Sequence, residues 1–220
     1  MALVLYELCG ANDLRFSPYC WRTRLALKKK GLDYTTEPVR FTDKEKIAFS
    51  GQIRVPVLVD NGKTVFDSWD IAEHLEDAYP DRPSLFPGAR GRQYAKMTQD
   101  WMNPLHKHIV GAIIFDIYNK LDPADFTYFR ESREKLLGGK LEDIQAGREQ
   151  SRQQFSEGFA SMRAHLMDQP FIAGAAPAYA DFIVFGSLKW ADLCSDFKLF
   201  AADDPISAWY GRVVAEMGVS

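Results

Sequence analysis

The pattern of hydrophobic and polar positions divides the chain into a mixed first part and a helical second part. In the first part, short apolar runs alternate with one longer amphipathic segment, which predicts the order strand, helix, strand. Asn61-Gly62 between two apolar runs predicts a hairpin. The predicted elements are strands at Leu3 to Leu8 and Asp33 to Val39, helices at Tyr19 to Lys30 and Thr42 to Phe49, hairpin strands at Val55 to Asp60 and Lys63 to Phe66, and a closing helix at Trp69 to Tyr79.

The second part has helical periodicity throughout. Turn-forming residues at 81–88 separate it from the first part and predict a linker, so we expect one domain at 1–80 and a second at 89–220. Pro104 predicts a bend in the first long helix, because proline removes a backbone donor there. The predicted helices are Arg90 to Asn119, Ala124 to Leu137, Glu142 to Met167, Tyr179 to Cys194 and Asp204 to Met217.

Composition narrows the class of protein. With 220 residues, 46% of them hydrophobic, and a formal net charge of −3, the chain lacks the basic character expected of a nucleic-acid or anionic-membrane binder. No apolar run reaches the ~18 residues of a membrane span, and no secretory signal is visible. The three cysteines are too few and too scattered for a disulfide framework, which favours a cytoplasmic location. Neither His-x-x-x-His nor Cys-x-x-Cys occurs, so we expect no metal site.

The candidate chemistry begins at Ser17-Pro18. Serine is a favoured N-cap and proline suits the first helical position, so a helix is expected to begin here. A hydroxyl at the positive end of a helix is well placed to hold an anion. Four residues of the second half, Ala178 to Asp181, keep the acid of a capping box but lack its hydroxyl, an omission expected to cost about 1 kcal/mol.

Several short motifs carry a resemblance that spans most of the chain. An α/β thioredoxin-like half followed by an all-α half resembles the cytosolic glutathione transferases, and the helical-half motifs are similar to those of the β-etherase class of bacteria and their fungal relatives. The motifs are Ser17-Pro18-Tyr19, Arg54-Val55-Pro56, Asp67-Ser68-Trp69, Tyr79-Pro80-Asp81, Ser132-Arg133-Glu134, Gly138-Gly139 and Leu141-Glu142-Asp143.

The resemblance implies glutathione as co-substrate, with Ser17 donating a hydrogen bond to its thiolate; backbone N–H groups or Asn12 are the alternatives. Asp67 would pair with the γ-glutamyl ammonium, while Ser68 and the helix start would take the carboxylate. A cis Val55–Pro56 bond would let the Val55 backbone pair with the cysteinyl backbone. Arg54 and Pro56 complete the predicted glutathione site.

The helical half is expected to supply the electrophile site. Trp101, Leu105, His108 and Phe115 recur at helical spacing, which suits an apolar pocket for a small aromatic electrophile. The resemblance implies attack of the thiolate on carbon with loss of a leaving group, such as phenolate from a β-aryl ether, and a homodimer with an interface near Phe66 and the helix after Arg90.

Two other functions fit the same residues. Ser17-x-x-Cys20 has the spacing of a redox motif, so a thiol transferase that depends on Cys20 is one alternative. The other is a binding protein of this fold that holds hydrophobic ligands with little or no turnover.

Overall fold

The first part of the chain forms a four-stranded sheet in the order β2-β1-β3-β4, seen in a computed structural model that describes residues 3–219. The strands β1 and β2 are parallel, β3 runs antiparallel to β1, and β4 runs antiparallel to β3. This confirms the predicted thioredoxin-like half. Two strands have the predicted bounds, and the other two, β2 and β3, each begin two residues later than predicted. The strands are β1 (Leu3–Leu8), β2 (Thr35–Val39), β3 (Val57–Asp60) and β4 (Lys63–Phe66).

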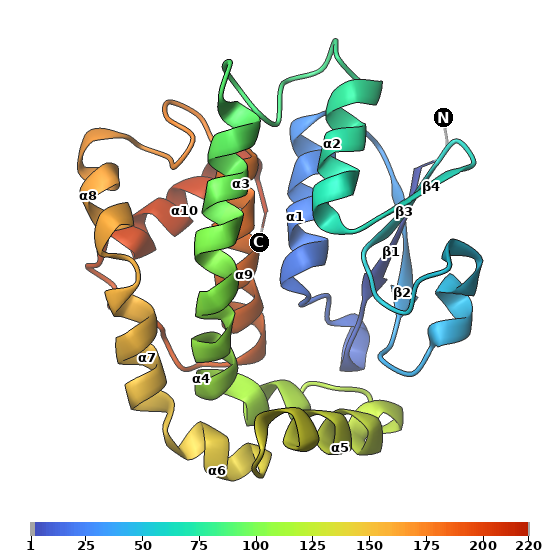
Figure 1. The fold of residues 1–220 in the computed structure, drawn as a ribbon, viewed down its shortest axis with the longest axis vertical. Coiled ribbons are helices and arrows are strands. Elements are labelled where there is room, and N and C mark those ends of the chain that lie inside the picture. The colour runs from blue at the N-terminus through green and yellow to red at the C-terminus, as the bar shows by residue number, and fades with distance from the viewer. Residues whose placement is uncertain (1–2, 220) are drawn as a thin grey trace.

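Two helices lie on the side of the sheet that faces the helical half, α1 (Pro18–Lys29) and α2 (Ser68–Ala78) (Figure 1). A short 3₁₀ helix, η2 (Lys44–Ser50), lies on the other side, and another, η1 (Ala11–Asp13), precedes α1. Leu5 and Leu58 are fully buried at paired positions of β1 and β3. The apolar strand positions therefore form the surface on which α1 and α2 pack.

The second part is all helical, as predicted. Pro104 lies in the 3₁₀ turn η3 (Asn103–Leu105), which divides the first long predicted helix into two at this position. The other elements are α3 (Gly91–Met102), α4 (His106–Tyr118), η4 (Pro123–Asp125), α5 (Phe126–Leu137), α6 (Leu141–Ala146), α7 (Arg148–Glu157), α8 (Ala160–Asp168), α9 (Tyr179–Cys194) and α10 (Pro205–Met217).

One predicted helix is wrong. Glu142 to Met167 does not form a single helix but three, with breaks at Gly147 and Gly158. Glycine is about 1 kcal/mol less favourable than alanine within a helix, so these are the positions where the chain changes direction most easily. The changes of direction carry α6, α7 and α8 around the outside of the helical half (Figure 1).

The centre of the molecule is the contact between α1 and α9. Nearly every residue of α9 is buried, and a Cβ atom on Gly186 would lie 2.4 Å from the Pro18 carbonyl oxygen. Because only a glycine allows this approach, the first turn of α1 lies directly against the helical half. The start of α1 is therefore fixed by both halves of the chain.

The end of α1 is also more buried than its three consecutive lysines indicate. Lys30 is 1% exposed; its Nζ lies 2.6 Å from Glu76 Oε2 and donates to the Tyr79 carbonyl oxygen at 3.1 Å. A long lysine side chain can bury its stem and still satisfy its charge. This lysine ties α1 to the end of α2.

Within residues 3–219, none of the helices is both long enough and apolar enough to cross a bilayer.

Candidate active site

Ser17 lies where the sequence places it, at the N-cap of α1. Its backbone is extended (φ −60°, ψ 126°), and its Oγ accepts from the Cys20 N–H at 3.4 Å. The side chain is buried, and its hydroxyl forms a side-chain hydrogen bond with Cys20 that acts to lower the pKa of that thiol, against the larger effect of burial. The capping interaction uses a lone pair of the oxygen, and a neutral thiol is a weak acceptor, so the O–H can turn to a stronger acceptor at the positive end of the helix.

The start of α2 carries the next predicted pair. Asp67 is its N-cap and accepts from the Trp69 N–H at 2.8 Å. The φ of Asp67 is 66°, in the left-handed region that non-glycine residues rarely adopt. Ser68 is buried, and its carbonyl oxygen accepts from the Tyr179 hydroxyl at 2.5 Å. The strained backbone at Asp67 is held by α9 through this contact, an arrangement typical of ligand sites.

Three cations gather next to the third predicted segment. The Val55–Pro56 peptide bond is cis, as the resemblance implied, and Arg54 beside it is exposed. Burial and the charges of Arg133 and Arg54 lower the pKa of Lys44; burial first, and then Arg54, also lowers the pKa of Arg133. Like charges held this close favour an anion between them. Sequence reasoning found Arg54 but missed Lys44 and Arg133, since Arg133 comes from α5 in the other half.

Arg22 is the other charged group that sequence reasoning did not assign. It is 1% exposed, its Nη1 lies 3.4 Å from Gln99 Oε1, and its Nε and Nη2 have no partner in the described part of the chain. Burial lowers its pKa, while the charge of Asp67 acts in the opposite direction. Its signal in the sequence is a charged residue on the buried face of an otherwise apolar helix.

Two sequence models match this chain. They describe the glutathione S-transferase N-terminal domain, matching residues 16–78, and the glutathione S-transferase C-terminal domain, matching residues 94–211. The chain belongs to the glutathione S-transferase family. Glutathione is the co-substrate of this family, and the α/β half followed by an all-helical half is its fold.

Individual members of the glutathione S-transferase family are distant in sequence. The chain is 24% identical over 215 residues to glutathione S-transferase U28 of Arabidopsis thaliana, which covers 94% of this chain and 85% of that protein. The structure of GSTFuA3 from Phanerochaete chrysosporium is similar with a TM-score of 0.88 and 24% identity, covering 98% of this chain and 97% of the other. CsGST63524 of Ceriporiopsis subvermispora, solved in complex with glutathione, gives a TM-score of 0.85 and 25% identity, covering 98% and 96%.

The cysteines of this glutathione S-transferase are buried. Burial raises the pKa of the Cys20 thiol to about 12, and Cys20 is 2% exposed. Cys9 and Cys194 are also buried free thiols with raised pKa values for the same reason. Since the thiolate is the nucleophile, these environments disfavour a reaction through Cys20.

The helical residues predicted to form the electrophile pocket are not brought together at Ser17. Trp101 donates from Nε1 to the Gly158 carbonyl oxygen at 3.2 Å, and its ring lies 4.9 Å from that of Phe159. Leu105 also contacts Gly158, and His108 bonds to Gln154 of α7. These three side chains therefore pack against α7 and the start of α8, because the same helical stripe supplies the core of the bundle.

Phe115, the fourth predicted residue, lies further along α4. Its ring stacks on Tyr118 at 5.9 Å, and the guanidinium of Arg130 lies 5.9 Å from its centroid. A side chain of α4 that reaches the first turn of α1 is His106, whose Nδ1 lies 3.4 Å from the Tyr19 hydroxyl.

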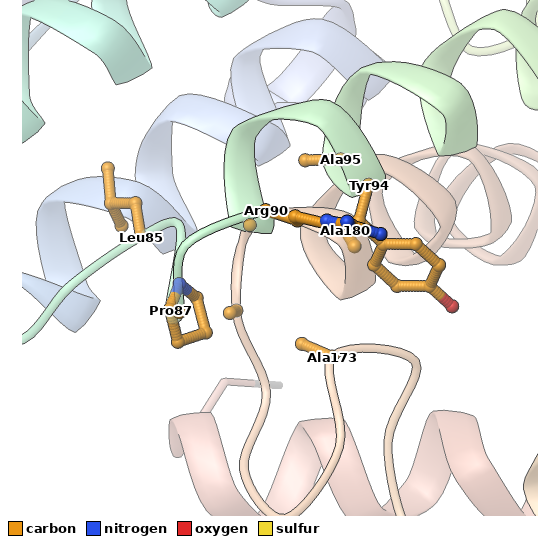
Figure 2. Close-up of a pocket in the computed structure, with 10 residues that line it drawn as sticks. Leu85, Pro87, Arg90, Tyr94, Ala95, Ala173 and Ala180 are labelled. Carbon is orange, nitrogen blue, oxygen red and sulfur yellow. The ribbon is translucent and has the colours of Figure 1, made fainter.

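A separate cavity of about 370 Å³ lies at the linker. It is bounded by the start of α3, the loop at Ala173 and the start of α9, with Arg90 and Tyr94 beside each other on one wall (Figure 2). None of the predicted site residues lines it. It is thus distinct from the surface where Ser17 and Asp67 lie.

Proposed function

We propose that this protein transfers glutathione to hydrophobic aromatic electrophiles, with the Ser17 hydroxyl holding the glutathione thiolate. One observation carries the proposal: the buried Ser17 Oγ accepts from the Cys20 N–H, and the described partner of its proton is the neutral Cys20 thiol, a weak acceptor that a thiolate would displace. The positive end of α1 and this donor would act on the same sulfur. The thiolate would attack an electrophilic carbon, and the bond to the leaving group would break.

The required effect on the thiol is modest. A free thiol with a pKa near ~8.5 is about 3% ionised at pH 7, and lowering that pKa by ~2 units makes the thiolate the major form, a change of ~2.7 kcal/mol. A hydrogen-bond donor to the charged form together with a helix N-terminus supplies an effect of this order.

Each of the other polar groups of glutathione has a predicted binding group in the protein. Asp67 makes no ion pair with a described residue and would bind the γ-glutamyl ammonium, while Ser68 and the start of α2 would take its carboxylate. The Val55 backbone would pair with the cysteinyl backbone beside Pro56. The cations Arg54, Lys44 and Arg133 would bind the glycyl carboxylate.

We further propose that β-aryl ethers are among the electrophiles, with phenolate as leaving group, on the basis of the helical-half motifs. The proposed cytoplasmic homodimer has a candidate interface where Phe66 of β4 and Met97 of α3 are 39% and 68% exposed. Exposed apolar side chains of this kind are typical of subunit contacts. The molecular mass in light scattering would decide between monomer and dimer.

The Ser17→Ala variant tests the proposal. We expect kcat/KM for thiol conjugation to fall about tenfold to a hundredfold, while the dissociation constant of glutathione changes less than about threefold, because the hydroxyl acts on the charged sulfur. Ser161→Ala on the exposed surface of α8 is the matched control and should leave both values unchanged.

Two results would contradict the assignment. Full activity of Ser17→Ala with every electrophile would transfer the role to backbone N–H groups or Asn12. Glutathione binding and ligand displacement by the wild type with no loss of free thiol, across a β-aryl ether, a halogenated aromatic and a peroxide, would favour the hydrophobic-ligand binding protein.

A further inference from the structure

A polar chain crosses the junction between the two halves of the molecule, next to Ser17. It begins at Tyr19, the second residue of α1, whose hydroxyl lies 3.4 Å from His106 Nδ1 with the two rings edge to face at 5.8 Å. It continues from His106 Nε2 to Ser187 Oγ at 2.7 Å. Three elements, α1, α4 and α9, thus contribute one side chain each.

The direction of each hydrogen bond follows from Ser187. Its hydroxyl is fully buried and lies 3.1 Å from the Ile183 carbonyl oxygen, which can only accept. The Ser187 proton is used in that bond, so Ser187 Oγ accepts from a proton on His106 Nε2. In the neutral ring His106 Nδ1 then carries a lone pair, and the Tyr19 hydroxyl donates to it.

The surroundings keep His106 neutral. Burial, followed by the nearby charge of Arg22, lowers the pKa of His106 to about 3. The guanidinium of Arg22 lies 4.6 Å from the centre of the Tyr19 ring, and the Trp190 ring meets the imidazole edge to face at 6.0 Å. At neutral pH, His106 Nδ1 is therefore a fixed hydrogen-bond acceptor.

The two ends of the chain differ in exposure. Ser187 is inaccessible, whereas Tyr19 is 37% exposed. The bond between Tyr19 and His106 is long for an O–H···N contact, so it is easily exchanged for a better partner. An accessible donor beside a fixed acceptor fits a group that can both donate and accept, which is a hydroxyl.

We propose that Tyr19 and His106 bind a free hydroxyl group on the electrophile, which accepts from the Tyr19 O–H and donates to His106 Nδ1. The inference rests on the proposed function, because the electrophile must lie beside a thiolate at Ser17 and against the helical half. His106 is the helical-half side chain that contacts the first turn of α1 through Tyr19. Ser187 is a positioning residue that fixes which nitrogen faces the substrate.

This site distinguishes three kinds of substrate. A phenol or alcohol satisfies both groups. A methyl ether can accept from Tyr19 but leaves His106 Nδ1 without a donor, and a carboxylate places a negative charge against that lone pair. The selected class is therefore hydroxylated aromatic electrophiles in preference to their O-methylated forms.

The test uses two conjugates that require no turnover, S-[2-(4-hydroxyphenyl)ethyl]glutathione and its methyl ether. We expect the wild type to bind the hydroxyl conjugate about tenfold more tightly, the ratio that one satisfied hydrogen bond supplies. Tyr19→Phe keeps the ring over Arg22 but removes the donor that both ligands use, so it should weaken both conjugates and leave the ratio near tenfold. His106→Leu removes the acceptor that only the hydroxyl conjugate satisfies, so it should reduce the ratio to about one. Tyr94→Phe, an exposed tyrosine on α3, is the control and should keep the full ratio.

Kinetics provide the second readout. With the 2-arylethyl bromides that form these conjugates, in which the thiolate displaces bromide, the preference should appear in KM with little change in kcat, and Ser187→Ala should reduce it partly. Equal affinities in the wild type, or a full preference retained in His106→Leu, would overturn the inference. Failure of both conjugates and glutathione itself to bind would instead reject the proposed function.

Discussion

The helices α1 and α9 pack against each other, yet their N-termini are built in opposite ways. α1 begins with a hydroxyl cap and no acid in its first turn. α9 begins at Ala178, which has no capping side chain, and carries Asp181 in its first turn. The start of α1 has a donor whose described acceptor is the weak Cys20 thiol, and the start of α9 has an acceptor that is fully used.

The carboxylate of Asp181 has a structural role, because all of its hydrogen bonds are made within the protein. Its oxygens accept from the backbone N–H groups of Ile172, Ala173 and Ala178 at 2.8–3.1 Å, and from Trp209 Nε1 at 2.9 Å. A buried group with all its bonds made contributes to stability and has nothing left for a ligand. The Ser17 hydroxyl, in contrast, has only a weak acceptor for its proton. The number and strength of the hydrogen bonds that each side chain already makes therefore distinguish a structural role from a binding role.

Replacing Asp181 would have the largest effect on folding. Asp181→Ala leaves four buried donors without their acceptor, so we expect the free energy of unfolding to fall by about 3–5 kcal/mol. Denaturant titration followed by tryptophan fluorescence measures it. Asp168→Ala, at the exposed end of α8, should change it by less than about 0.5 kcal/mol. A loss at Asp181 no larger than that of Ser17→Ala would remove the distinction between the two helix starts.

The predictions that succeeded from sequence alone depend on neighbouring residues. A serine before a proline, an aspartate before a helix and Asn-Gly between apolar runs each act within a few residues, and Ser17, Asp67 and the hairpin lie where they are expected. Arg133 reaches the neighbourhood of Arg54 only through the path of α5, which no local pattern contains.

The sequence does not predict in the same way which side chains of the helical half contact each other. An apolar stripe does not say which neighbouring helix covers it, so the contacts of Trp101 and Leu105 with Gly158 could not be predicted from the sequence. The burial of Lys30 likewise has no local signal in the sequence, because its partner Glu76 lies on another helix. His106 gains its importance from Tyr19 and Ser187, both distant in the sequence.

The contact that joins the two helix starts offers an intermediate test. Gly186→Ala places a Cβ 2.4 Å from Pro18 O, so we expect a loss of about 1–3 kcal/mol in unfolding free energy as α1 and α9 separate. Activity should fall as well, because the first turn of α1, which carries Ser17, moves when α1 and α9 separate. Gly211→Ala on α10 is the control: its Cβ meets nothing within 4 Å, and it should stabilise the protein by about 0.5–1 kcal/mol. Two losses of equal size would show that glycine, and not the close approach, is what matters.

The smallest expected effect comes from giving α9 the cap that α1 already has. Ala178 has an extended backbone suited to an N-cap, and it borders the cavity at the linker, which leaves room for one more atom. Ala178→Ser should therefore raise the free energy of unfolding by about 1 kcal/mol, because the new oxygen can accept from an N–H of the first turn. The pair Ala178→Thr and Ala178→Val separates the hydroxyl from the added volume, and the threonine variant should be the more stable of the two. Conjugation rates should not change in any of these variants, since the cap completes the start of α9 and leaves the Ser17 hydroxyl untouched. A threonine variant no more stable than its valine counterpart would mean that Asp181 already satisfies this end of α9.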